Sequence, residues 1–226
     1  SPARGDPVRL MAGFNHPPLL PGWIDRPHQA LPLGRFALEN GAAIEDFVLS
    51  YVVHGTMNAD RSNVVLALTA IGSSHHRLDF VIGPGRALDT DRFCIVVADA
   101  IGNGLTTSPS NSAAQPGIDF PRFTIRDMVA SQKALVDHLG IPRLHTVIGA
   151  SMGGMQALQW AVSHPQRMDR VAALVPMAQT TAWSVAVNEA ARRALMADPE
   201  WATGPALRGW HAWTAIMQAL AARTPE

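Results

Sequence analysis

The sequence predicts an α/β fold, with a mostly parallel sheet, helices on both faces and an added helical cap. Four short apolar runs are each long enough for a strand that is buried on both faces. They occupy residues 64–69, 93–99, 145–150 and 171–177. Helical patterns lie between the later runs, and buried strands that alternate with helices indicate a parallel sheet.

The chain before residue 64 is not expected to follow this pattern of buried strands and helices. Residues 1–34 are rich in proline and glycine and are predicted to form an irregular arm. Apolar alternation around Phe47 then predicts paired strands joined at Glu39-Asn40-Gly41. Residues 35–177 are therefore assigned to the α/β core.

Two helices are predicted within the core. The segment TIRDMVASQKALVDHLG places its apolar residues on one face of a helix. Thr124 and Asp127 resemble a capping pair at its start, and Gly140 stands where a helix stop belongs. A second helix follows Ser151 and is ended by Pro165.

The pattern changes after Met177, because no strand-like run follows it. Residues 178–226 contain two helical segments with several tryptophans, and we expect a cap or lid that could also form a homodimer surface. The later strands of the expected sheet, and with them the C-terminal part of the fold, are expected to lie outside this chain.

Composition limits the classes of partner. Hydrophobic residues make up 47% of the 226, charged residues make up 16%, and the formal net charge is zero. This balance is ordinary for a globular protein and favours neither nucleic acid nor an anionic membrane as a partner.

The single cysteine, Cys94, excludes an internal disulfide and is expected in the core. No apolar run approaches the ~20 residues of a membrane span. No signal peptide is visible, so we expect a cytoplasmic protein, although a processed leader would also leave Ser1 first.

The stretch VIGASMGGMQALQWA carries the strongest chemical signal. Ser151 stands between glycines, with a strand pattern before it and a helix pattern after it, as in the Gly-x-Ser-x-Gly nucleophile elbow. A side chain at 149 or 153 would clash across such a sharp turn. Ser151 is therefore the candidate nucleophile, and the alternative is an inert serine in a glycine-rich turn.

A nucleophilic serine also needs two hydrogen-bond donors for the oxyanion. One is expected to be the backbone N–H of Met152, and the other to come from the Leu68–Thr69 segment at the end of an earlier strand. No metal site is predicted, because the adjacent His75 and His76 lack further ligands at a recognisable spacing.

Five segments together resemble the homoserine O-acetyltransferase family, which has the α/β-hydrolase fold. They read NADRSNVVLALT, GPGRALDTDRFCIVVAD, DFPRFTIRDMVASQKALVDHLGI, VIGASMGGMQALQWAVSHPQRMDR and NEAARRALMADPEW. The resemblance implies Ser151 as the acyl-accepting nucleophile and the backbone N–H groups of Leu68 and Met152 as the oxyanion pair. It also implies that Arg192 binds the substrate carboxylate, the alternative being a solvated helix charge. Arg193 is expected to be a surface residue that does not share the face of Arg192.

Two departures from the family fall where the acyl acceptor would bind. AIGNGLTTSPSNS replaces the family's cysteine- and glycine-rich stretch, and no tyrosine follows DPEW. We therefore expect hydrolysis of small acetyl-type esters, without a cofactor. The first alternative is homoserine O-acetyltransfer with acetyl-CoA as co-substrate, and the second is a non-catalytic α/β-hydrolase module.

The partners of the serine are not evident in this sequence. After Ser151 the histidines are His164 and His211, and the aspartates are Asp169 and Asp198. His164 and Asp169 follow the second helix directly, and the other pair lies in the helical segment. The triad Asp and His are therefore expected in a missing C-terminal segment or in a second polypeptide.

Overall fold

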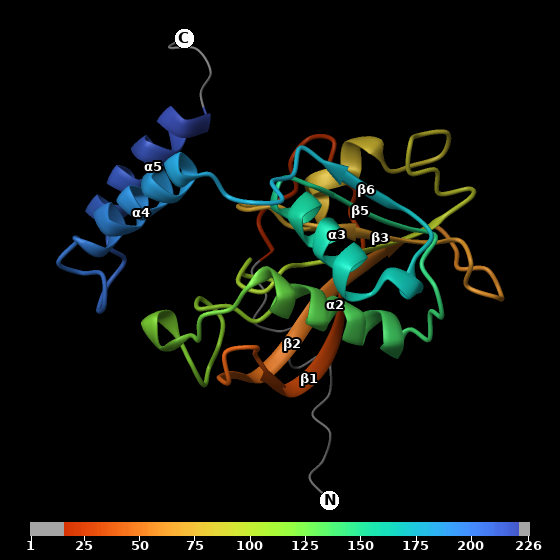
Figure 1. The fold of residues 1–226 in the computed structure, drawn as a ribbon, viewed down its shortest axis with the longest axis horizontal. Helices are drawn as coiled ribbons and strands as arrows, with labels where there is room; N and C mark the ends of the chain where they lie inside the picture. Colours follow the sequence, from red (N-terminus) through yellow and green to blue (C-terminus); the bar gives the residue numbers. More distant parts are fainter. Residues whose placement is uncertain (1–15, 222–226) are drawn as a thin grey trace, which may run out of the picture. The chain divides into compact units, whose positions relative to one another are not determined.

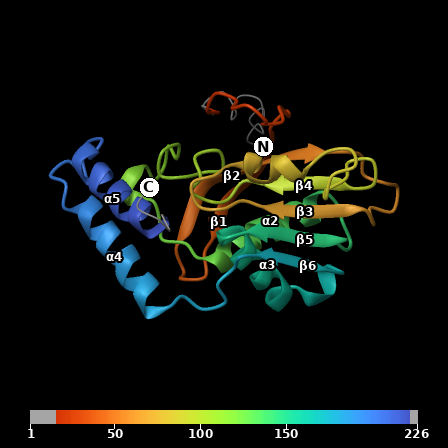
Figure 2. The same cartoon turned by 90° about the horizontal axis from the view of Figure 1, so that it is seen from above.

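The computed structural model describes residues 16–221, which contain six strands in one sheet of order β1-β2-β4-β3-β5-β6. β2 pairs antiparallel with β1 on one side and with β4 on the other. The strands β4, β3, β5 and β6 run parallel to one another. Figure 2 shows these four parallel strands following one another across the sheet. Their bounds are Gln29–Ala37 for β1, Ala43–His54 for β2, Val64–Leu68 for β3, Cys94–Ala98 for β4, Thr146–Ala150 for β5 and Val171–Leu174 for β6.

The expected irregular arm is shorter than predicted. Its last residues form part of β1, which begins at Gln29 opposite Tyr51 of β2. Two register shifts, around Gly34, accommodate the irregular composition, and Pro32 is tolerated because β1 is an edge strand. The predicted hairpin is confirmed, since Leu38 donates its N–H to the Ala42 carbonyl across a turn containing Gly41. Residues 1–15 of the arm lie outside the described residues.

The predicted helices of the core cover one face of the sheet. α2 (Ile125–His138) and α3 (Met152–Ser163) lie side by side over this face (Figure 1). Trp160 of α3 is fully buried there, in one cluster with Leu66 of β3 and Leu135 of α2. Such contacts, repeated along both helices, remove the apolar face of the sheet from water.

The second face is covered differently from the prediction. Within the described residues its cover is the 3₁₀ helix η1 (His75–Val81) and the chain that follows, not an α-helix. Leu78 and Ile82 pack there with Val65 and Val97 of the central strands. The sequence predicted helices on both faces of a mostly parallel sheet, and here the described residues place a 3₁₀ helix and irregular chain instead.

The capping interactions predicted for α2 are confirmed. The Thr124 side chain accepts from the backbone of Arg126 and Asp127, and the Asp127 carboxylate accepts the Thr124 N–H. Its other carboxylate oxygen accepts the N–H of Glu39, 2.8 Å away, so the cap also fixes the β1–β2 hairpin. Gly140 adopts φ 64° just after the helix, as a stop signal should.

The chain divides into two compact units between Met177 and Ala178. In the second unit α4 (Ala182–Met196) packs against α5 (Leu207–Ala221), as Figure 1 shows. Gly209 allows the close approach, because a Cβ there would lie 2.4 Å from the carbonyl oxygen of Leu195. Across residues 16–221, no helix combines the length and the apolar character needed to cross a membrane.

Candidate active site

Ser151 occupies a sharp turn between β5 and α3. Its backbone has φ 55° and ψ −119°, a strained conformation for a residue with a side chain. The turn is held because the Ser151 N–H donates to the Leu174 carbonyl at the end of β6, 3.0 Å away. The side chain is half-buried at the carboxyl edge of the parallel strands, where ligands bind in open α/β sheets.

The glycines on either side of Ser151 explain why this turn can form. A Cβ on Gly149 would lie 2.3 Å from the backbone carbonyl carbon of Gly153. A Cβ on Gly153 would lie 2.5 Å from the carbonyl oxygen of Leu68. Both contacts involve backbone atoms that cannot rotate away, so the prediction that side chains at 149 and 153 would clash is confirmed.

The close approach at Gly153 brings the end of β3 against the start of α3. Leu68 is the last residue of β3 and pairs with Gly149 of β5. Met152 is the first residue of α3, and the first N–H groups of a helix have no partner within it. The two segments expected to supply the oxyanion donors are therefore adjacent, on both sides of the serine turn.

A buried polar network, which the sequence did not reveal, supports this arrangement. The Gln156 side chain of α3 donates to the carbonyl of Thr69, 3.0 Å away, and so holds the chain just after Leu68. Its amide oxygen accepts from Gln132 of α2 at 2.6 Å, and Gln132 in turn accepts from the Trp160 indole at 2.8 Å. The only signal in the sequence was two glutamines on otherwise apolar helix faces.

His164 and Asp169 lie at the wrong end of α3 to serve Ser151. Twelve helical residues separate His164 from the turn, a span of about 18 Å at 1.5 Å per residue. Asp169 forms an ion pair with Arg143, and its N–H donates to the Leu144 carbonyl just before β5. Both residues therefore belong to the amino edge of the sheet.

Asp198 and His211 belong to the second unit, and the carboxylate there has a structural role. Asp198 accepts the backbone N–H groups of Gly209 and Glu200, at 2.7 and 2.9 Å. It therefore fixes the connection between α4 and α5. His211 is exposed on α5.

Arg192 lies on α4 and binds within its own helix. Two of its nitrogens contact both carboxylate oxygens of Glu189, at 2.7 and 2.8 Å. Arg193 binds the same carboxylate at 2.7 Å. The expectation that the two arginines cannot share a face was wrong, because positions three and four residues after Glu189 both face it. Both pairs are solvent-exposed, and a role for Arg192 in substrate binding stays a prediction.

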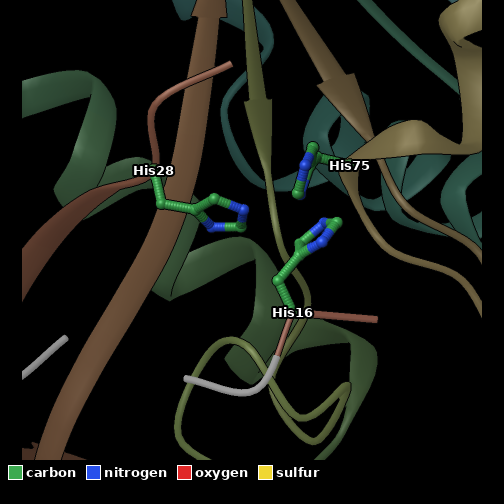
Figure 3. A group of neighbouring side chains, drawn as sticks. All are labelled: His16, His28 and His75. Atoms are coloured by element: carbon green, nitrogen blue, oxygen red, sulfur yellow. The ribbon is translucent and has the colours of Figure 1, made fainter. Parts of the chain in front are cut away.

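A cavity of about 1000 Å³ opens beside the carboxyl ends of β3 and β4. One wall comes from the arm, including Trp23, and another from the loop containing His76 and Asp79. A third wall is the loop from Gly102 to Asn111, and Ser151 is not among the lining residues. Beside the cavity, His16, His28 and His75 bring their rings together (Figure 3).

The nucleophile-elbow class of α/β proteins is defined by a strained serine between a parallel strand and a helix, with glycines that allow backbone contact. A family model described as the alpha/beta hydrolase fold matches residues 63–216. The chain belongs to this family.

The relatives are named either as homoserine acyltransferases or as ester hydrolases. Homoserine O-acetyltransferase of Methanosalsum zhilinae is 41% identical over 185 residues, which are 74% of this chain and 37% of that protein. Homoserine O-succinyltransferase of Leptothrix cholodnii is 42% identical over 185 residues, 74% of this chain and 49% of that protein. An acetylester hydrolase from Corynebacterium glutamicum superposes with a TM-score of 0.81 at 31% identity, covering 86% of this chain and 59% of that one. The chain thus spans half or less of the length of these curated relatives.

Proposed function

We propose that Ser151 accepts an acyl group and that the protein hydrolyses small acetyl-type esters. The observation that supports this most is the φ of 55° at Ser151, held between backbone contacts to β3 and β6. Strain of this kind is retained where the surrounding structure fixes it, and it is common at catalytic residues. An inert turn or a purely binding module needs no such conformation.

The reaction would proceed in two steps. The Ser151 hydroxyl attacks the ester carbonyl, and the N–H groups of Met152 and Leu68 stabilise the oxyanion. The alcohol then leaves with a proton from a general acid, and an activated water releases the acid product and frees the serine. The base and its carboxylate partner would come from a C-terminal segment or from a second polypeptide, because neither pair available after Ser151 fits the role.

The acceptor half of the site favours water over an amino-acid hydroxyl. A transferase must bind its acceptor through specific polar contacts and keep water away from the acyl-enzyme. The loop from Gly102 to Asn111 replaces the stretch expected in an acetyltransferase, and it lines a cavity whose lining residues do not include Ser151. Transfer to homoserine from acetyl-CoA is the second candidate, supported by the names of the curated relatives and by Arg192, whose guanidinium suits a carboxylate.

A partition experiment distinguishes the two functions. The whole enzyme is supplied with p-nitrophenyl acetate or acetyl-CoA, with and without homoserine, and free acetate is measured against O-acetylhomoserine. We expect acetate to be the main product even with homoserine present. Dominant O-acetylhomoserine at modest homoserine concentration would instead establish the transferase.

Replacement of Gln156 should slow catalysis without weakening substrate binding. Gln156→Met keeps the approximate volume but loses the hydrogen bond to the Thr69 carbonyl, so the segment carrying Leu68 is less firmly held. Small displacements of catalytic groups can reduce rates by up to about 100-fold, and we expect kcat to fall about 10- to 100-fold with KM nearly unchanged.

Gln159→Met is the matched control for this measurement. It lies on the same helix, and its side chain donates a hydrogen bond to Ser163, 2.7 Å away at the far end. Its kcat should stay close to that of the unaltered enzyme. Equal kcat for both variants would show that Gln156 does not position the oxyanion segment.

A further inference from the structure

We propose that His16, His28 and His75 bind one divalent transition-metal ion, with zinc as the reference ion. One ring nitrogen from each histidine lies within 4.8 Å of the others. The three rings come from separate segments, the arm, the residue before β1 and the start of η1, and Figure 3 shows them facing one another. Three imidazoles with a fourth position open to water form a common type of zinc site.

Hydrogen bonds determine which nitrogen of His75 is available. Asp99, at the end of β4, is fully buried and receives the Ser50 hydroxyl, the Asn103 amide and the His75 backbone N–H. Because these are all donors, its carboxylate acts only as an acceptor. The His75 Nδ1, 3.2 Å from Asp99, therefore carries the proton. The lone pair of His75 is left on Nε2.

The same carboxylate orients His28 through Ser50. The Ser50 hydroxyl gives its proton to Asp99 at 2.9 Å, so it can only accept from His28 Nδ1, 3.1 Å away. The lone pair of His28 is then on Nε2. A carboxylate that fixes the tautomer of metal-binding histidines from outside is a regular feature of zinc sites. Here one buried aspartate serves two of the three ligands.

A second carboxylate orients His16 through His76. Asp79 accepts the Ile24 N–H and lies 2.6 Å from His76 Nδ1, so that nitrogen donates and His76 Nε2 is an acceptor. His16 Nε2 lies 3.0 Å from His76 Nε2 and must donate to it. The lone pair of His16 is therefore on Nδ1, and each of the three rings keeps one lone pair free for a ligand.

The geometry suits a metal. Bonds of about 2.0 Å in a tetrahedral site place ligand nitrogens about 3.3 Å apart, so the rings would close by roughly 1.5 Å. His16 and His28 are only half-buried, and small side-chain rotations at the arm accommodate this change.

A metal at this position would attach the arm to the core. His16 and His28 enclose the arm segment with Trp23, whose ring stacks on His76 at 4.1 Å and lines the cavity. Coordination to His75 would fix that segment against the loop after β3. We therefore infer an ion that holds one wall of the cavity, independent of the acyl chemistry at Ser151.

The test uses protein without a histidine tag, stripped with a chelator and then titrated with Zn²⁺ or Co²⁺. We expect one ion per chain, a rise in the thermal unfolding temperature with zinc, and the visible absorption of tetrahedral Co²⁺. His28→Gln should weaken zinc binding at least 100-fold, and Ser50→Ala or Asp99→Asn about 10- to 100-fold. His138→Gln, on an exposed position at the end of α2, should leave the affinity unchanged.

The variants are compared after their metal-free folds have been checked by circular dichroism. A stoichiometry near zero in the unaltered protein would overturn the proposal, as would unchanged zinc affinity in His28→Gln. If His28→Gln does not fold, His16→Gln decides the question by the same titration. A loss of stability in these variants that does not depend on zinc would identify the cluster as a hydrogen-bond network only.

Discussion

Ser151→Ala should reduce ester hydrolysis by a factor on the order of 10⁴ or more, because removal of a triad nucleophile leaves only the residual effect of binding and the oxyanion donors. The fold should be unaffected, since alanine can keep the hydrogen bond from residue 151 to the Leu174 carbonyl. The measurement is kcat on p-nitrophenyl acetate for the whole enzyme. Mass spectrometry after a serine-directed phosphonate should place the adduct on the peptide containing Ser151.

Ser163→Ala provides the control for both measurements. This serine ends the same helix, and its side chain accepts a hydrogen bond from Gln159. Its variant should hydrolyse ester and take up phosphonate like the unaltered enzyme. An adduct on any serine other than Ser151, or full turnover by Ser151→Ala, would disprove the proposed nucleophile and favour the non-catalytic module.

The elements that the sequence predicted well are those with local causes. The sequence signals of the cap formed by Thr124 and Asp127 and of the turn at Gly149, Ser151 and Gly153 each lie within a few positions. Local patterns of this kind can be recognised without knowledge of the folded chain. These features allowed the serine turn, the helix after it and the strand before it to be placed in order.

The elements that were missed depend on contacts between distant residues. The strand starting at Gln29 forms because β2 pairs with it, and its proline and glycine content concealed that partner. The three histidines at 16, 28 and 75 have no regular spacing, and only the folded chain brings them together. Gln132 and Gln156 likewise find each other across two helices.

The acceptor specificity could not be predicted for a different physical reason. Backbone N–H donors such as those of Leu68 and Met152 leave no trace in side-chain identity. The cavity wall from Gly102 to Asn111 is a loop with its own hydrogen bonds, including Asn111 to the Gly104 carbonyl at 2.9 Å.

Gly153→Ala should damage both stability and acyl transfer, although it adds a single methyl group. The new Cβ would lie 2.5 Å from the Leu68 carbonyl oxygen and 3.1 Å from that of Thr69. Neither oxygen can move without shifting β3 or the segment after it. Overpacking of a well-ordered core costs about 1–3 kcal/mol, and here the displaced chain is also the expected oxyanion segment.

Urea unfolding and phosphonate labelling together test this expectation. We expect a lower unfolding midpoint with an unchanged slope, and slower labelling of Ser151 under conditions where the variant is still folded. Gly204→Ala is the control, because the nearest atoms to its Cβ belong to the Glu200 side chain and lie no closer than 3.2 Å. Unchanged stability together with unchanged labelling in Gly153→Ala would contradict the contact with β3. If the variant is destabilised but its labelling is unchanged, the packing contact would stand and Leu68 would not be an oxyanion donor. Displacement of an oxyanion donor typically costs 10²–10³ in rate.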